Sequence, residues 1–145
     1  VTVPVGQVSD EANRLIDVTQ ESLRRAIDAV HTGGRLSDIS HAVQAAVEAE
    51  GFSVVRLFVG HGIGRSLHEE PQIPNFGPPG HGPVLKTGMV LAIEPMVNAG
   101  SPDVMILEDR WTAVTCDGSL SAHFEHTVAL TENGTEVLTS LDGRG

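Results

Sequence analysis

Cysteine, basic residues and long apolar runs are scarce in this chain of 145 residues. Its single cysteine, Cys116, excludes an intrachain disulfide, so nothing in the sequence requires an oxidising compartment. Only 9 lysines and arginines stand against 19 acidic residues, and the formal net charge of −10 argues against binding nucleic acid through a basic face. We find neither a signal-peptide pattern nor an apolar run of membrane-spanning length. We therefore expect a cytoplasmic protein that binds neither nucleic acid nor membranes.

The first third of the chain has the periodicity of two amphipathic helices. Ser9 is the expected N-cap of the first helix, which runs to about Val30. Ser37 is the expected N-cap of the second, which ends before Gly51. Strands are predicted over four later segments: Phe52 to Val59, Met89 to Val97, Val104 to Leu107 and Ser121 to Leu130. This order predicts an α+β fold in which two helices pack on an antiparallel sheet within one domain.

The densest chemistry lies between Gly60 and Pro71, where His61 and His68 stand in a segment rich in glycine. Glycine on both sides of His61 allows close approach of another backbone or a ligand, so the imidazole can be presented at the end of a strand without crowding. Such a histidine suits a metal ligand. The alternative is a turn that carries two histidines with no ligand role.

Carboxylates in two later apolar segments supply candidate partners for His61. Glu94 is the only charge in the run from Met89 to Val97, and a buried carboxylate without a partner is costly or has a strongly raised pKa. Glu125 leads into the next apolar segment, where strand alternation places it on one face with His123. One imidazole and two carboxylates that converge from separate strands suit a first-row divalent metal.

Three segments together resemble the C-terminal half of a type I methionine aminopeptidase: Gly60 to Pro71, Leu91 to Met96, and Leu120 to Thr127. They occur in the order of that family, with Trp111 between the last two, and the resemblance covers nearly the whole chain. It implies the pita-bread fold of creatinases and aminopeptidases, with residues 1–145 as a single catalytic domain. In that family the preceding half carries two aspartate ligands, so we expect this sequence to be a fragment that lacks its N-terminal half.

The resemblance also implies roles for four residues. His61, Glu94 and Glu125 match metal ligands for two divalent ions, and their mixed nitrogen and oxygen donors are compatible with cobalt, manganese, iron or zinc. His68 matches a catalytic histidine that contacts the scissile peptide group. Glu94 is also expected to take a proton from the attacking water and pass it to the leaving amine.

Two residues near these motifs are expected to contact substrate together with His68. Trp111 matches a wall of the methionine pocket, although as the only tryptophan it can equally be a core residue. Leu67 stands where the family often has an aromatic pocket residue. His123 keeps two interpretations, either support of Glu125 or an ordinary surface position.

The function that the resemblance implies is metal-dependent removal of the N-terminal methionine from newly made polypeptides. Its partners are then a peptide that begins with methionine, and the ribosome with its nascent chains. Two alternatives share the fold. One is a non-catalytic module that binds peptides or partner proteins, and the other is a dipeptidase of the prolidase type, which the segment around Glu125 disfavours.

Overall fold

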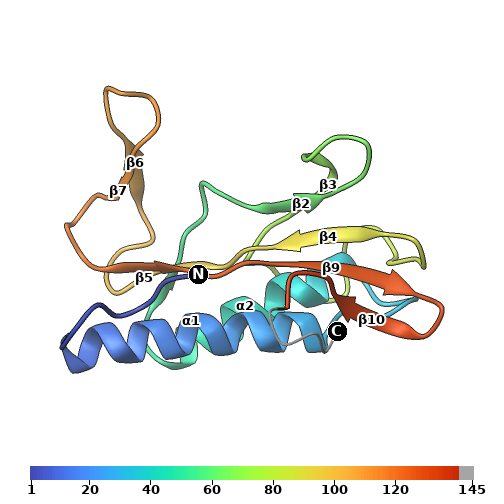
Figure 1. The fold of residues 1–145 in the computed structure, drawn as a ribbon, viewed down its shortest axis with the longest axis horizontal. Coiled ribbons are helices and arrows are strands. Elements are labelled where there is room, and N and C mark those ends of the chain that lie inside the picture. Colours follow the sequence, from blue (N-terminus) through green and yellow to red (C-terminus); the bar gives the residue numbers. More distant parts are fainter. Residues whose placement is uncertain (141–145) are drawn as a thin grey trace.

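The computed structural model describes residues 1–140, and these residues form two helices and ten strands (Figure 1). The helices are α1 (Asp10–Asp28) and α2 (Leu36–Ala49). The strands are β1 (Ser53–Val54), β2 (Gly60–Gly62), β3 (Glu69–Ile73), β4 (Val90–Ile93), β5 (Met96–Asn98), β6 (Val104–Ile106), β7 (Ala113–Thr115), β8 (Ser121–His123), β9 (His126–Thr131) and β10 (Gly134–Val137). Both helices lie on the same side of the sheets, which confirms the predicted α+β layering.

The helix starts follow the sequence signals in one case and depart from them in the other. Ser9 caps α1, and its hydroxyl accepts a hydrogen bond from the Ala12 N–H at 3.2 Å. The prediction of Ser37 as the cap of α2 is wrong, because Arg35 holds that position and its N–H donates to the Asp38 carboxylate. The Ser37 hydroxyl instead accepts from a loop N–H. Within residues 1–140, no helix is both long and apolar enough to cross a membrane.

The strands pair antiparallel throughout the described chain. One sheet has the order β10-β9-β4-β2-β3, and a second has the order β1-β5-β8. Strands β6 and β7 form a separate hairpin, which projects away from the helices in Figure 1. In the first sheet β4 lies between β2 and β9, so residues at the end of β4 are close to both neighbours.

Two segments that were predicted as continuous strands are each divided. The chain leaves β4 at Ile93 and enters β5 at Met96, and it leaves β8 at His123 and enters β9 at His126. Because β4 pairs with β9 and β5 pairs with β8, both segments pass from one sheet to the other at the same level. Pro95 lacks an N–H for the ladder, which explains the interruption in the first segment. We call these two connections, residues 94–95 and 124–125, the seam between the two sheets.

The core lies between the helices and the sheets. The fully or nearly fully buried apolar side chains include Leu15, Leu23 and Ala26 of α1, Ile39, Val43 and Val47 of α2, and Leu91, Ile93, Val97 and Val128 of the strands. Burial of each large aliphatic side chain contributes about 1.5–3 kcal/mol. The strands on either side of the seam are therefore anchored to one core.

Candidate metal centre

The seam brings two carboxylates together. Glu94 lies between β4 and β5, and Glu125 lies between β8 and β9. The pairs Ile93 with His126 and Met96 with His123 enclose this region, and the Phe124 N–H donates to the Pro95 carbonyl at 3.3 Å. Two residues about 30 positions apart in sequence are thus held as neighbours by strand pairing.

Strand β2 delivers His61 to the same place. His61 pairs with Ala92 of β4, directly upstream of the seam. A Cβ at Gly60 would collide with the carbonyl oxygen of Ala92, and a Cβ at Gly62 would collide with the carbonyl oxygen of Glu70. The glycines that flank His61 are therefore required by close approach of neighbouring backbones, as their sequence context indicates.

The His61 ring is oriented with one nitrogen toward Glu94. Its Nδ1–H donates to the Gly62 carbonyl at 2.9 Å, since a carbonyl can only accept. This bond leaves Nε2 as the lone-pair nitrogen, and it lies 3.5 Å from Glu94 Oε1. Only 13% of the His61 side chain and 16% of the Glu94 side chain are exposed. Such a second hydrogen bond is typical of histidines that bind metal.

His68 lies beside His61 at the edge of a cavity. The two ring centroids are 4.1 Å apart and the rings are tilted by 43°. The cavity has a volume of about 420 Å³, and its wall combines His61, His68 and Glu94 with Leu57, Phe58, Val59 and Met96. The structure therefore joins both histidines and Glu94 of the predicted site in one concave surface with an apolar wall.

The surroundings of Glu94 disfavour its ionised form. Burial raises its pKa to about 7, the Glu125 carboxylate adds to the rise, and His61 opposes it. The pKa of His123 is lowered, mainly because burial disfavours the imidazolium. The folded chain thus favours the neutral forms of Glu94 and His123, and a cation in their midst would reverse this for the carboxylate.

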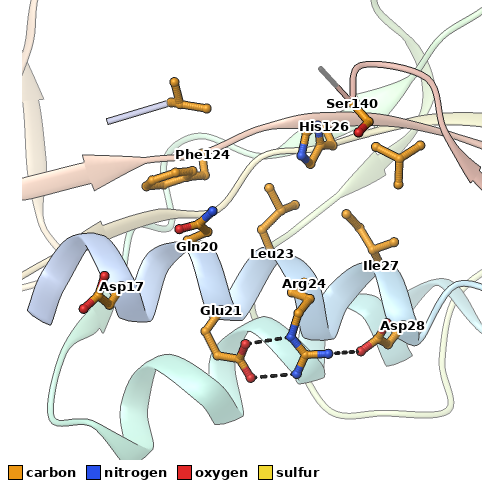
Figure 2. A pocket seen from close by; sticks show the side chains of 12 residues that line it. Asp17, Gln20, Glu21, Leu23, Arg24, Ile27, Asp28, Phe124, His126 and Ser140 are labelled. Carbon is orange, nitrogen blue, oxygen red and sulfur yellow. Dashed lines mark hydrogen bonds and ion pairs between the residues drawn. The ribbon is translucent and has the colours of Figure 1, made fainter. Parts of the chain in front are cut away.

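His123 is the residue that sequence reasoning left open. Glu94, His123 and Glu125 each offer a ligand atom, and these atoms lie within 4.8 Å of one another. Phe124 and His126 instead line a cavity beside α1, so the predicted alternation of faces is confirmed (Figure 2). The alternation of His123 and Glu125 was the only sequence signal for this grouping.

Two predicted substrate contacts are strongly exposed and do not line the cavity of His61 and His68. Trp111 is 90% exposed in the β6–β7 hairpin, so its interpretation as a core residue is wrong. Leu67 is 69% exposed in the loop between β2 and β3. Neither side chain lines the cavity that holds His61 and His68.

A somewhat larger cavity, of about 470 Å³, lies between α1 and the segment of Phe124 and His126 (Figure 2). Three of its charged residues are already paired, since Arg24 of α1 bonds to both Glu21 and Asp28. The smaller cavity combines His61 and His68 with the Glu94 carboxylate, which has no arginine or lysine partner among residues 1–140, so this cavity is the candidate metal centre.

Comparison with known proteins places the chain in a family of metal-dependent peptidases. The model of metallopeptidase family M24 matches residues 1–132. Methionine aminopeptidase 1 of Bacillus subtilis is 60% identical over 140 residues, which cover 97% of this chain and 56% of that protein. Methionine aminopeptidase of Escherichia coli is 50% identical over 135 residues, covering 93% of this chain and 51% of that protein. The chain spans about half the length of the curated relatives that it matches.

Solved structures confirm the fold. The methionine aminopeptidase of Thermotoga maritima superposes with a TM-score of 0.91 at 56% identity, over 94% of this chain and 55% of that one. The prolidase of Pyrococcus furiosus is similar in fold alone, with a TM-score of 0.72 at 24% identity, over 95% of this chain and 35% of the prolidase. The predicted pita-bread fold is thus the observed one, and with its family match over nine-tenths of its length the chain belongs to metallopeptidase family M24.

Proposed function

We propose that this chain forms the C-terminal part of the active site of a methionyl aminopeptidase, an enzyme that hydrolyses the first peptide bond of polypeptides beginning with methionine. The observation that carries the proposal is the convergence of His61, Glu94 and Glu125 near a cavity that also holds His68. Relatives named methionine aminopeptidase, at up to 60% identity, support this substrate over that of a prolidase.

The residues at the seam fit divalent metal ions. His61 would bind through Nε2, and Glu94 and Glu125 would bind through carboxylate oxygens, with two ions shared among them. Their nitrogen and oxygen donors are compatible with cobalt, manganese, iron or zinc. A divalent ion, when bound, supplies a water of lowered pKa and polarises a carbonyl. The raised pKa of Glu94 supports the fit, because its ionised form lacks a positive partner among the described residues.

Glu94 is proposed to carry the proton during hydrolysis. Among the described residues it is the only carboxylate in the wall of the 420 Å³ cavity, so it can reach a water that attacks a peptide bound there. It would accept the proton of that water and deliver it to the leaving amine. Accepting and then donating at one atom requires no other acid in the site.

His68 is proposed to donate a hydrogen bond to the substrate carbonyl as negative charge develops on its oxygen. Its ring is exposed at the cavity edge and stacks near His61, so one face remains open to a peptide. Loss of one donor of this kind costs about 100-fold or more in rate.

Trp111 and Leu67 are proposed to contact the substrate side chain. Both are exposed apolar residues in connections that leave the layered core, where a bound peptide can cover them. Residues 1–145 would act as one catalytic domain. Nascent chains at the ribosome, in the cytoplasm, would provide the substrates.

The test is release of methionine from a Met-Ala peptide in the presence of added divalent metal. Two preparations are compared, the chain alone and the chain co-expressed with the N-terminal half of the Bacillus subtilis relative. Release is expected to disappear in His61→Ala and to persist in His41→Ala, which removes an exposed histidine of α2. Faster cleavage of an Ala-Pro dipeptide, or no methionine release in either preparation, contradicts the proposal.

A further inference from the structure

A buried asparagine lies in the long connection between β3 and β4. Asn75 is only 1% exposed, although it belongs to a segment rich in proline and glycine that follows β3. Asparagine is mostly an exposed residue, and a buried side-chain amide needs hydrogen-bond partners. The burial of Asn75 therefore indicates a specific contact of its amide inside the protein.

That contact is with the backbone of Glu94. The Asn75 Nδ2–H donates to the Glu94 carbonyl at 3.1 Å, across 19 positions of sequence. Because a carbonyl only accepts, the nitrogen of the amide, and not its oxygen, must face it. Asn75 does not line the 420 Å³ cavity, so its contact with the site is made through Glu94.

The Glu94 carbonyl lies between the two ladders of hydrogen bonds at the seam. Pairing of β4 with β9 ends at Ile93, and pairing of β5 with β8 begins at Met96. Pro95, between them, has no N–H to donate. The Asn75 amide therefore supplies a hydrogen bond at a position that strand pairing does not cover.

The loop that carries Asn75 is fixed on both sides of this residue. Upstream, Ile73 is buried and pairs with Gly60 of β2. Downstream, the Gly77 N–H donates to Oε1 of Gln44 in α2 at 2.8 Å. The amide of Asn75 is thus held in place by the fold itself, as a group that orients a functional side chain requires.

We propose that Asn75 is a positioning residue for Glu94: its amide fixes the Glu94 backbone so that the carboxylate faces His61 Nε2 at 3.5 Å. The carbonyl and the side chain of Glu94 are joined to the same Cα, so rotation of the unsupported peptide group would redirect the carboxylate. This inference rests on the role of Glu94 in the proposed function. Residues that orient a metal ligand typically contribute about 10–100-fold to metal affinity or activity.

The experiment compares the parent chain with Asn75→Leu, which keeps the branched shape of the side chain and removes its amide. Calorimetry measures Zn²⁺ affinity, and NMR of metal-free protein records the ¹³C resonance of the Glu94 main-chain carbonyl. Both are measured on the chain alone and on the chain co-expressed with the N-terminal half. We expect the carbonyl resonance to move and Zn²⁺ affinity to fall by about 10–100-fold. In the preparation that releases methionine, kcat should fall by a similar factor while KM stays nearly constant.

Gln44→Met is the matched control, because it removes another side-chain hydrogen bond of the same loop, one that does not involve Glu94. It should leave the Glu94 carbonyl resonance and Zn²⁺ affinity unchanged, even where it lowers Tm. Circular dichroism checks that each variant keeps its fold. If Asn75→Leu does not fold, Asn75→Ser takes its place, since the smaller side chain fits and its hydroxyl is too short to replace the amide.

Four results overturn the proposal: an unmoved Glu94 carbonyl resonance, a moved resonance with unchanged Zn²⁺ affinity, an equal loss of affinity in Gln44→Met, or no Zn²⁺ binding by the parent chain in either preparation. Failure of the proposed function has a different signature. Asn75→Leu would then move the carbonyl resonance and weaken Zn²⁺ binding, while the parent chain released no methionine from Met-Ala in either preparation.

Discussion

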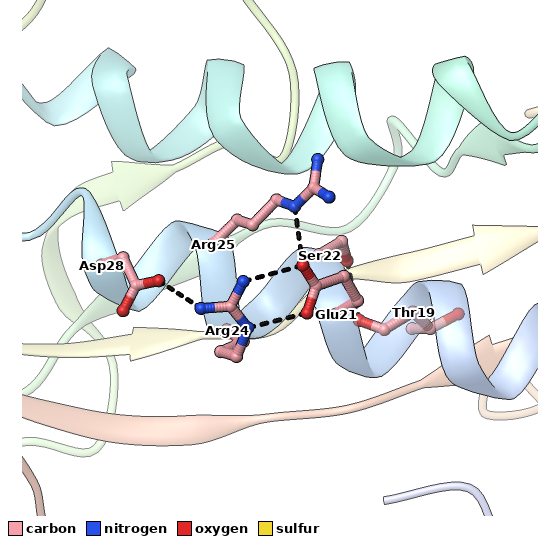
Figure 3. Close-up of polar contacts among 6 residues, drawn as sticks. All are labelled: Thr19, Glu21, Ser22, Arg24, Arg25 and Asp28. Carbon is pink, nitrogen blue, oxygen red and sulfur yellow. Dashed lines mark hydrogen bonds and ion pairs between the residues drawn. The ribbon is translucent and has the colours of Figure 1, made fainter.

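Two glutamates of this chain show opposite responses to their surroundings. Glu21 of α1 accepts hydrogen bonds from Arg24 and Arg25 at 2.7–2.8 Å, and these bonds lower its pKa to about 2 (Figure 3). Glu94 at the seam has no arginine or lysine partner in the described chain, and its pKa rises to about 7. The helix surface pairs its carboxylate with arginines, whereas the seam holds a carboxylate whose ionised form has no such partner among the described residues.

The largest effect is expected where that charge is removed. Glu94→Gln replaces the carboxylate that faces both imidazoles by a neutral amide, so Zn²⁺ affinity should fall by more than about 100-fold. Glu21→Gln is the matched control on α1 and should leave the affinity unchanged. Calorimetry measures the Zn²⁺ affinity of both variants. An equal loss of affinity in the two would contradict the expectation that Glu94, and not Glu21, binds the cation.

The next effect concerns rate alone. In the preparation that releases methionine, His68→Ala should lower kcat by about 100-fold, because one hydrogen-bond donor to the developing oxyanion is lost. The side chain is exposed, so Tm should stay the same. Steady-state kinetics and thermal unfolding are measured on one sample. A loss confined to KM would assign His68 to substrate binding instead.

The pH dependence of stability should separate the two glutamates. The pKa of Glu94 is higher in the folded chain than in the unfolded one, so the folded state binds the extra proton between about pH 4.5 and 7. Its contribution to the free energy of unfolding is therefore present at low pH and is lost as pH rises through about 7, by about 1–3 kcal/mol.

The pKa of His123 is lowered on folding, so its contribution to the free energy of unfolding changes with pH in the opposite direction. The measurement therefore compares the parent chain with a variant changed at Glu94 alone. We expect metal-free Glu94→Gln to become more stable than the parent chain as pH rises from 5 to 8, measured by urea unfolding with a chelator present. Added Zn²⁺ should cancel this advantage. A difference independent of pH would contradict the raised pKa.

The smallest effect belongs to α1. The pKa of Glu21 is depressed on folding, so its stabilising contribution is present above the unfolded pKa near 4.5 and is lost as pH falls toward about 2. Exposed ion pairs contribute little and are screened by salt. Arg24→Ala should therefore lower Tm only slightly at neutral pH. High salt should reduce the difference in Tm between this variant and the parent chain. A large fall in Tm would contradict this expectation, because it would mean that the ion pairs of Arg24 stabilise α1 strongly.

The sequence singled out Glu94 because its signal is local. A single charge in an apolar strand is unusual wherever the strand lies, and the glycines around His61 indicated a crowded backbone. The layering of two helices on a sheet also followed from periodicity alone. These features depend on residues that are neighbours in the chain.

What the sequence left open depends on pairing between distant segments. The grouping of His123 with Glu94 requires that β5 pair with β8 in one register, which no local pattern specifies. The exposure of Trp111 depends on a hairpin that leaves the core, although aromatic residues are usually buried. Ser37 has an ordinary cap residue's chemistry, but a distant loop uses its hydroxyl.

The seam between the two sheets has a mechanical consequence. Each carboxylate lies in a short connection that joins the five-stranded sheet to the three-stranded one, and His61 belongs only to the larger sheet while His123 belongs only to the smaller. A cation held by His61, Glu94 and Glu125 would add a link at the connections between two sheets that already pack on one core. Tight binding of the cation would then also fix the orientation of one sheet relative to the other.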